Sequence, residues 1–219
     1  MENPKFRFYH IPKTGGTSIF GITRTWTNHK RAHPNHNHVR IIKTLPDPDD
    51  IAYAVTRHPY SRFSSAFYHV MDACNEKFFY RNAKVSDCDW LISKGFDNKL
   101  LVFNNDPNEF LYALMERSSP YHIMARTVFY HFDIFRPQFY WIGDPRTMRI
   151  HHSIKFILRQ ENLEHEFETM VAQPLGQVPE WDNSVNKRIT ADTIPLTDTS
   201  KGLLRKLYPL DFGNFGHEA

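Results

Sequence analysis

Short apolar segments alternate along the chain with stretches whose apolar residues recur at helical spacing. Runs of strand length, rich in apolar, β-branched or aromatic residues, occur at residues 6–11, 39–42, 51–56, 139–143 and 154–158. Helical patterns occupy residues 17–26, 60–71, 87–93, 107–117, 162–172 and 199–208. Strands that alternate with helices predict an α/β fold with a mainly parallel central sheet, which binds ligands beyond the carboxyl ends of its strands.

Composition indicates a globular protein and excludes some functions. The chain has 219 residues, 15% of them aromatic, and no repeat, low-complexity tract or linker, so we expect a single domain over residues 1–219. Its 27 basic and 24 acidic residues leave a net charge of +3. That charge is too small for a protein that coats nucleic acid, although it would suit an anionic ligand if it were focused in one cleft.

The N-terminal sequence has no apolar stretch of signal-peptide length, and no segment approaches the roughly 18 apolar residues of a membrane span. We therefore expect a soluble, cytoplasmic protein with no membrane span. Cys74 and Cys88 lack the spacing of zinc or redox sites. They are expected to be reduced thiols, with a single disulfide bridge as the alternative.

The stretch between the first strand and the first helix carries the strongest chemical signal. It sets a lysine, two adjacent glycines and three hydroxyl groups at a helix start, in the order Lys13, Thr14, Gly15, Gly16, Thr17 and Ser18. Glycines let the backbone approach a ligand closely, and helix-start amides beside a lysine favour a phosphate. An ordinary glycine turn capped by a hydroxyl is the alternative. Because the lysine precedes the glycines, the order is not that of the Walker A loop of ATPases and GTPases.

A second anion site is indicated at the end of the strand over residues 51–56. Arg57 ends this strand, and Ser65 lies eight residues further on, in the helix that starts near Pro59. A guanidinium and a hydroxyl at a strand-end crevice suit a second phosphate. A helix-capping arginine and a buried serine would give the same pattern. The pair is therefore good evidence for a phosphate site only together with the Lys13 loop.

Residues 10–18 (HIPKTGGTS) and 55–67 (VTRHPYSRFSSAF) resemble the two nucleotide-binding motifs of sulfotransferases that use 3′-phosphoadenosine 5′-phosphosulfate (PAPS), in their carbohydrate-type branch. The resemblance continues in the same order through residues 136–138, 159–164, 185–187 and 208–216, and so covers nearly the whole chain. It implies a P-loop-kinase-like three-layer sandwich with helices on both faces of the sheet. His58 departs from the family, which more often has Asp or Asn there, and this removes an acidic neighbour of Arg57.

The resemblance also implies how the nucleotide is bound. Residues 13–18 would hold the 5′-phosphosulfate, with Lys13 stabilising the leaving oxygen, and Arg57 and Ser65 would hold the 3′-phosphate. Lys187 would reach the nucleotide from a C-terminal loop.

Four histidines, His29, His33, His36 and His38, invite three interpretations. A zinc site is disfavoured because no cysteine or nearby carboxylate completes a familiar ligand set. Solvated loop residues are the second interpretation. The third is a base for the acceptor proton, because a histidine titrates near ~6.5. Residues 36–39 resemble the His-x-His-Val segment of uronyl 2-O-sulfotransferases, which makes His38 the base and His36 its supporting partner, and a shift of two residues would exchange their roles.

The function hypothesised from the sequence is sulfuryl transfer from PAPS to a hydroxyl, on a carbohydrate, with PAP as product and no metal required. A P-loop-type nucleotide kinase or NTPase, or a non-catalytic nucleotide- or polyanion-binding module, is the alternative. Three tryptophans that could stack on a sugar, Trp90, Trp141 and Trp181, are interpreted as core. Glu161 and Glu164 fit a helix start better than a glycosidase pair, and His151–His152 fits a strand-edge pair.

Overall fold

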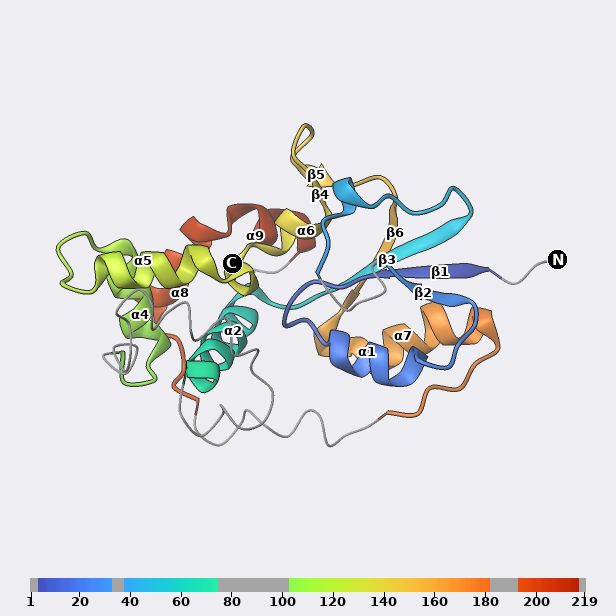
Figure 1. Cartoon of the computed structure of the whole chain (residues 1–219), viewed down its shortest axis with the longest axis horizontal. Coiled ribbons are helices and arrows are strands. Elements are labelled where there is room, and N and C mark those ends of the chain that lie inside the picture. Colours follow the sequence, from blue (N-terminus) through green and yellow to red (C-terminus); the bar gives the residue numbers. More distant parts are fainter. Residues whose placement is uncertain (1–3, 33–37, 75–102, 182–192, 217–219) are drawn as a thin grey trace. The chain divides into compact units, whose positions relative to one another are not determined.

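The computed structural model describes residues 4–32, 38–74, 103–181 and 193–216. Contacts divide the chain into two compact units (Figure 1). The first comprises Met1–Arg62, Pro137–Thr190 and Tyr208–Ala219, and the second comprises Phe63–Arg136 and Ala191–Leu207. Each unit is described by itself, and the single domain expected over residues 1–219 stays a prediction.

The first unit is built on a four-stranded sheet in the order β2-β1-β3-β6, in which every neighbouring pair is parallel. The strands are β1 (Lys5–Tyr9), β2 (His29–Arg31), β3 (Asp50–Thr56) and β6 (Ile154–Arg159). Six of the seven residues of β3 are buried, as its continuous apolar run requires for a central strand covered on both faces. The α/β fold with a mainly parallel sheet is therefore confirmed.

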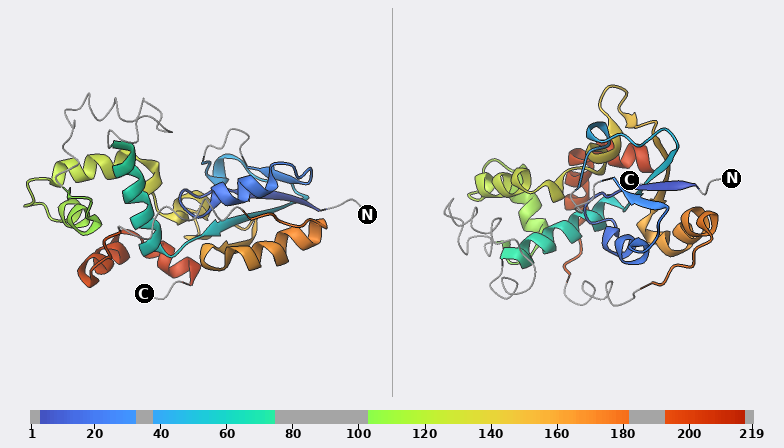
Figure 2. Two further views of the ribbon diagram at one scale, coloured as in Figure 1. Left: turned by 90° about the horizontal axis from the view of Figure 1, so that it is seen from below. Right: turned by 45° about the vertical axis from the view of Figure 1, so that its right-hand side comes forward.

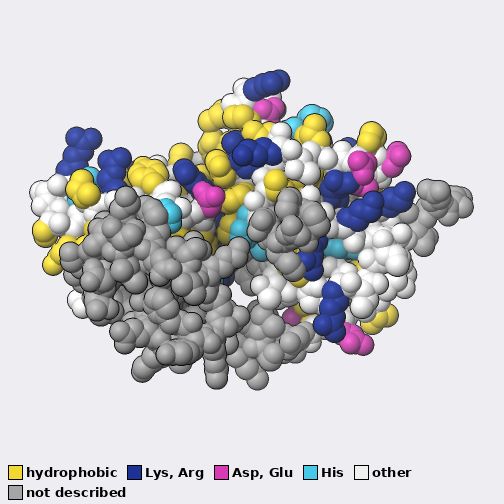
Figure 3. All heavy atoms as spheres, in the orientation of Figure 1, with side chains coloured by type: hydrophobic (Ala, Val, Ile, Leu, Met, Phe, Trp, Pro, Cys, Tyr) yellow, Lys and Arg dark blue, Asp and Glu magenta, His cyan; other side chains and the backbone are white. Residues whose placement is uncertain are grey.

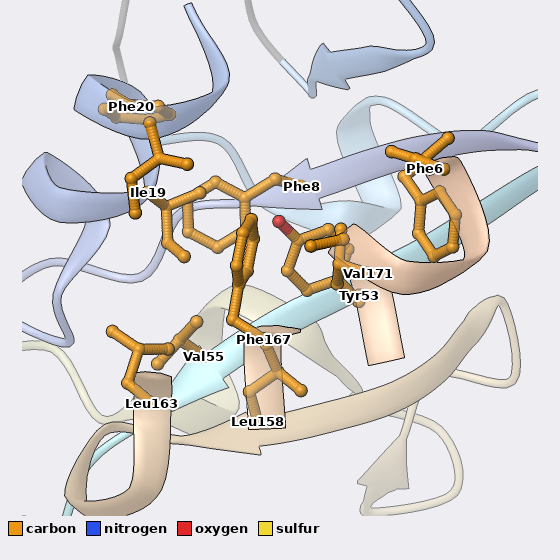
Figure 4. Close-up of a cluster of buried hydrophobic side chains, with 13 residues drawn as sticks. Phe6, Phe8, Ile19, Phe20, Tyr53, Val55, Leu158, Leu163, Phe167 and Val171 are labelled. Carbon is orange, nitrogen blue, oxygen red and sulfur yellow. The ribbon is translucent and has the colours of Figure 1, made fainter. Parts of the chain in front are cut away.

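Helices cover both faces of this sheet (Figure 2). On one face, α1 (Gly16–Thr23) and α7 (Leu163–Phe167) enclose a cluster that includes Phe8, Tyr53 and Phe167 (Figure 4). On the other face, α6 (Gln138–Ile142) and α9 (Pro209–Phe215) lie over a second cluster, which includes Trp141. Each fully buried large apolar side chain contributes about 1.5–3 kcal/mol, so these two layers fix where the strand ends lie.

Shorter elements complete the first unit. A hairpin pairs β4 (Gly143–Asp144) with β5 (Arg149–Ile150). Single turns are η1 (Ile41–Lys43), η4 (Gln160–Asn162) and η6 (Gln173–Leu175), and the π-helical turn η5 (Glu168–Ala172) extends α7.

The second unit is helical and has an aromatic core. It contains most of α2 (Pro59–Cys74), which starts in the first unit, together with α4 (Pro107–Met115), α5 (His122–His131), the turn η3 (Asp133–Phe135) and α8 (Asp198–Leu207). Its buried core includes five stacked or edge-on phenylalanines, Phe63, Phe67, Phe103, Phe110 and Phe135. The Asp106 side chain caps α4 by accepting a hydrogen bond from the Asn108 amide at 2.8 Å.

Most expected elements are present within a few residues of their predicted bounds. The strands expected at residues 6–11, 51–56 and 154–158 are β1, β3 and β6, and the helices expected at 17–26, 60–71, 107–117, 162–172 and 199–208 are α1, α2, α4, α7 with η5, and α8. The helix expected at residues 87–93 lies outside the described residues. The helices α5 and α9 and the β4–β5 hairpin were not predicted.

Two predicted strands are wrong. Residues 39–42 contain the turn η1 instead of a strand, and the remaining strand of the sheet is β2, which pairs with β1 over three residues. The buried Ile41 of this turn packs against the sheet face as part of the second cluster. A short apolar run alone does not distinguish a strand from a segment that covers a sheet.

The segment 139–143 is also not a strand, because it lies largely in helix α6. The reason is a contact from far along the chain. The carboxylate of Asp211 accepts hydrogen bonds from the amides of Gln138 and Phe139 at 2.7 and 2.8 Å, and it thereby satisfies the start of the helix. Local sequence contains no sign of this cap.

Across the described part of the chain, no helix combines the length and the apolar character that crossing a bilayer requires.

Candidate active site

The loop between β1 and α1 has the backbone form of an anion cradle. Lys13 and Gly15 both adopt left-handed backbone conformations, with φ of 65° and 96°. Among the described residues no side chain caps α1. The Ser18 amide donates to the Gly15 carbonyl at 3.1 Å, so the amides of Gly16 and Thr17 are the ones that remain for a ligand. Left-handed residues beside an uncapped helix start turn successive N–H groups toward one point, where they favour an anion.

The two glycines of this loop meet different constraints. A side chain at Gly15 would be strained by its positive φ, and its Cβ would lie 2.9 Å from Leu163 Cδ2. A Cβ at Gly16 would lie 2.0 Å from Nε2 of His10, whose ring occupies that space. Gly16 is thus a close-approach position between the helix start and an imidazole.

The three hydroxyl groups of the loop are placed differently. Thr14 is fully buried, and its hydroxyl donates to the carbonyl of Ile11 at 2.9 Å, so it braces the turn rather than facing an anion. Thr17 is exposed and Ser18 is half-buried. The assignment of Thr14, Thr17 and Ser18 to the nucleotide site stays a prediction, in which the buried Thr14 hydroxyl supports the turn.

Arg57 stands at the end of β3, and a remote glutamine holds its backbone. The Arg57 amide donates to Gln138 Oε1, and Gln138 Nε2 donates to the Arg57 carbonyl, both at 2.8 Å. The Arg57 side chain donates from Nε to Ser61 Oγ at 3.1 Å. Burial lowers the pKa of Arg57, the nearby Glu161 carboxylate opposes that change, and Arg62 adds to it. Arginine still stays charged at neutral pH, so the strand end presents an oriented cation.

A buried network connects this arginine to the Lys13 loop. The Asp211 carboxylate that caps α6 also fixes Gln138, through its main-chain amide. Arg62 is fully buried and donates from Nε to the Pro12 carbonyl at 3.0 Å. Burial raises the pKa of Asp211, whereas Arg62 and the two amide hydrogen bonds lower it. One set of interior polar groups thus supports both strand ends.

The hydrogen bonds of His58 show how a histidine can replace the Asp or Asn expected at this position. Its Nδ1 accepts a hydrogen bond from the Tyr60 amide at 3.3 Å, in the second position of α2, which is the task that Asp or Asn performs at a helix start. Its amide donates to Glu161 Oε1 at 2.7 Å. The loss of an acidic neighbour expected for Arg57 is therefore offset, because Glu161 supplies the carboxylate from η4.

Ser65 lies in the second unit, on α2, and is buried. It follows Ser61 by four residues, so the two serines occupy the same face of that helix. His36 and Lys187 lie outside the described residues, as do His33, Cys88 and Trp90.

The described histidines of the predicted cluster have separate environments. His29 is buried on β2, and its Nε2 is 2.7 Å from the Tyr53 hydroxyl. Burial, and secondarily Arg31, lowers the pKa of His29 to about 4, so it is neutral at physiological pH. His38 is exposed, and its ring centroid lies 4.4 Å from that of His10 and 5.6 Å from that of Trp141. The prediction that a strand follows His38 is wrong, since the turn η1 comes next.

A cavity of about 290 Å³ lies beside the loop. Gly15 and Ser18 form one side, and Gln160, Asn162 and Trp181 are part of the rest. Glu161 and Glu164 also line it, so the cavity suits an uncharged part of a ligand better than a phosphate.

Other residues weighed from the sequence have structural roles. Trp141 is buried in the second core cluster, as expected, and Trp181 packs at the edge of the first. His151 and His152 stack with centroids 4.4 Å apart directly after β5. Within the described ranges, no three His, Cys, Asp or Glu side chains are grouped closely enough to hold a metal ion.

Sequence reasoning missed three groups that support the site. His10 belongs to the recognised motif but received no role, and Gln138 and Asp211 were only noted within corroborating segments. Their contacts span 73 and 81 residues, so nothing in local spacing could have revealed them.

Basic side chains on the visible face are spread among hydrophobic, acidic and other groups (Figure 3). Where side chains are described, this face shows no continuous basic stripe of the kind that polyanion-binding proteins use.

Comparison with known proteins agrees with this geometry. Searches of curated proteins and of solved structures found no match. A sequence model described as the sulfotransferase family matches residues 2–218, almost the entire chain. The uncapped helix start, the strand-end arginine and the parallel sheet are the features expected for a protein that handles an anionic donor, and the chain belongs to the sulfotransferase family.

Proposed function

We propose that this sulfotransferase transfers a sulfuryl group from PAPS to a hydroxyl group of a carbohydrate. The observation that carries the proposal is that two features suited to anions stand at adjacent parallel strand ends. One is the cradle after β1, and the other is the held Arg57 after β3. PAPS carries phosphate groups at both ends of its ribose, and two separate cationic sites match that distribution.

The 5′ end of the donor fits the loop. Its anionic groups would accept hydrogen bonds from the amides at the start of α1, which directly follows the left-handed Lys13 and Gly15. The donor, when bound, supplies the sulfuryl group. Lys13 would place its ammonium at the oxygen that gains charge as the sulfur leaves, because stabilisation of developing charge dominates this type of transfer.

The 3′-phosphate is assigned to Arg57 and Ser65. The guanidinium is oriented by its backbone contacts with Gln138 and by Ser61, so little ordering is required when the phosphate arrives. Lys187 would add a further positive charge from the C-terminal part of the chain.

The nucleoside is assigned to the cavity beside the loop. The Trp181 indole offers an apolar surface for a base, and the amides of Gln160 and Asn162 offer donors and acceptors. Its glutamates would repel a phosphate, which is consistent with phosphates bound at the two cationic sites instead.

His38 is assigned as the base that takes the acceptor proton, with His36 as its supporting partner. His38 is exposed to an incoming hydroxyl, and its ring contacts His10, which itself lies against Gly16 of the loop. A positioned base of this kind contributes about 10²–10⁴ in rate. The carbohydrate acceptor rests on the resemblance of residues 36–39 to uronyl 2-O-sulfotransferases.

Calorimetry and transfer assays test the proposal. PAP should bind more tightly than adenosine 5′-phosphate, ATP or GTP, because only PAP carries the 3′-phosphate. Arg57→Ala should weaken PAP more than adenosine 5′-phosphate, while the exposed Arg117→Ala should leave both unchanged. Equal binding of PAP and adenosine 5′-phosphate by the wild type would contradict the donor assignment, and release of PAP from PAPS with a panel of sugars identifies the acceptor.

A further inference from the structure

One contact near the loop has no place in the proposed roles. The imidazoles of His10 and His38 lie with centroids 4.4 Å apart and planes inclined by 48°. His10 extends from the end of β1, whereas His38 comes from the segment before η1. Two titratable rings from separate segments therefore meet at the edge of the anion cradle.

His10 is held firmly on its other sides. Its ring fills the space that a Cβ of Gly16 would take, and it packs edge-on against Phe20 at 5.0 Å and against Phe8 at 5.8 Å. His38 in turn lies 5.6 Å from Trp141 of α6. The fixed ring of His10 thus links the glycine loop to the exposed ring of His38.

From this contact we infer that His10 is a positioning residue for His38. In this role His10 sets the distance between His38 and the loop. It also disfavours the protonated form of His38 before the acceptor binds. Positive charges on two rings whose centroids are 4.4 Å apart repel each other, so a proton on one ring disfavours a proton on the other. The inference rests on the proposed function, in which His38 must be neutral to accept the hydroxyl proton.

The described segments next to the pair carry several cations. The Arg31 guanidinium of β2 lies 4.1 Å from the centroid of Phe20, the ring that touches His10. Lys13 belongs to the loop, and Arg40 stacks on Tyr140, next to Trp141. α1 contributes no charged side chain, and β2 also carries Lys30 and the buried His29. Positive charge near an imidazole disfavours its protonated form.

The first test follows the two rings without any ligand. Titration of the imidazole Cε1–H signals by NMR should show a His38 midpoint that moves to higher pH in His10→Phe, a variant that keeps a ring in the packed space. The exposed His131→Asn should leave the His38 midpoint in place. An unchanged midpoint in His10→Phe would overturn the coupling, and His10→Gln provides a smaller replacement should the phenylalanine impair folding.

The second test connects the pair to the reaction. In His10→Phe, turnover at pH 6 relative to pH 8 should fall several-fold, with about tenfold as the limit for a displacement of the acid limb by one pH unit, while PAP affinity stays within a few-fold. Loss of turnover by the same factor at both pH values would show a merely structural role and overturn the inference. A wild-type protein that transfers nothing from PAPS would instead refute the proposed function, and the NMR titration would still report on the pair.

Discussion

The two proposed anion sites lie at neighbouring strand ends but are built in opposite ways. The Lys13 cradle is formed by a contiguous stretch whose backbone itself supplies the donors. The Arg57 site depends on one side chain, and residues far along the chain hold the backbone of that arginine. The first site is therefore determined by consecutive residues, whereas the second forms only when folding brings distant residues to Arg57.

The largest expected effect concerns the chemistry of the local site. Lys13→Ala should lower turnover roughly 10²–10³-fold, the scale at which loss of a transition-state donor is felt. PAP affinity should fall much less, because the amides of the cradle remain. Both residues carry a Cβ at the same positive φ, so backbone strain is not altered. Lys5→Ala, at the exposed start of β1, is the control in steady-state assays. Turnover within a few-fold of the wild type would remove Lys13 from the mechanism.

The remote site should respond to a change far from any ligand. Asp211→Asn replaces one of two accepting oxygens by a donor that faces an amide, which should cost about 2–3 kcal/mol of unfolding free energy. Because Gln138 then holds Arg57 less well, PAP affinity should fall more than affinity for adenosine 5′-phosphate. Urea unfolding and calorimetry measure both, with the exposed Asp198→Asn as control. If the ratio of the affinities for the two nucleotides is unchanged, Asp211 and Gln138 do not position Arg57 for the 3′-phosphate.

Two glycines of α1 allow a crowded position and an open position to be compared within one helix. Gly16→Ala forces a methyl group into the ring of His10, and such overpacking costs about 1–3 kcal/mol. Gly21→Ala meets no atom within 4 Å, so it should stabilise the helix by about 0.5–1 kcal/mol. Opposite signs in urea unfolding are expected. The same sign for both would show that the ring of His10 yields easily.

The smallest effect tests the cap on α2. His58→Ala removes the acceptor for the Tyr60 amide and should cost about 1 kcal/mol, whereas His58→Asn should retain most of the stability. Thermal or urea unfolding of the two variants provides the comparison. If alanine and asparagine behave alike, the hydrogen bond at Nδ1 has no measurable value.

These differences explain how far the sequence could be interpreted. The loop from Lys13 to Ser18 was predicted as an anion site because its glycines, lysine and helix start are consecutive. Segment 139–143 was misassigned because its helical form depends on Asp211, about seventy residues away. The inward turn of the Thr14 hydroxyl to Ile11 could not be predicted, because only the fold shows it. Features formed by consecutive residues can be predicted from sequence alone, whereas features formed by contacts between distant residues cannot.

The burial of His29, beside the Tyr53 hydroxyl, makes the fold itself sensitive to acid. The pKa of His29 is about 4 in the folded protein, whereas an unfolded histidine titrates near ~6.5. Between these values the unfolded chain binds a proton that the folded protein excludes. Stability is thus unaffected above about pH 6.5 and declines by about 3 kcal/mol as the pH falls to about 4. Urea unfolding over this range should show a flatter pH profile in His29→Gln. The free energy of unfolding of a typical domain is about 5–15 kcal/mol, so a loss of this size is a large part of it. The stability of the sheet in acid therefore depends on one uncharged imidazole in the short edge strand β2.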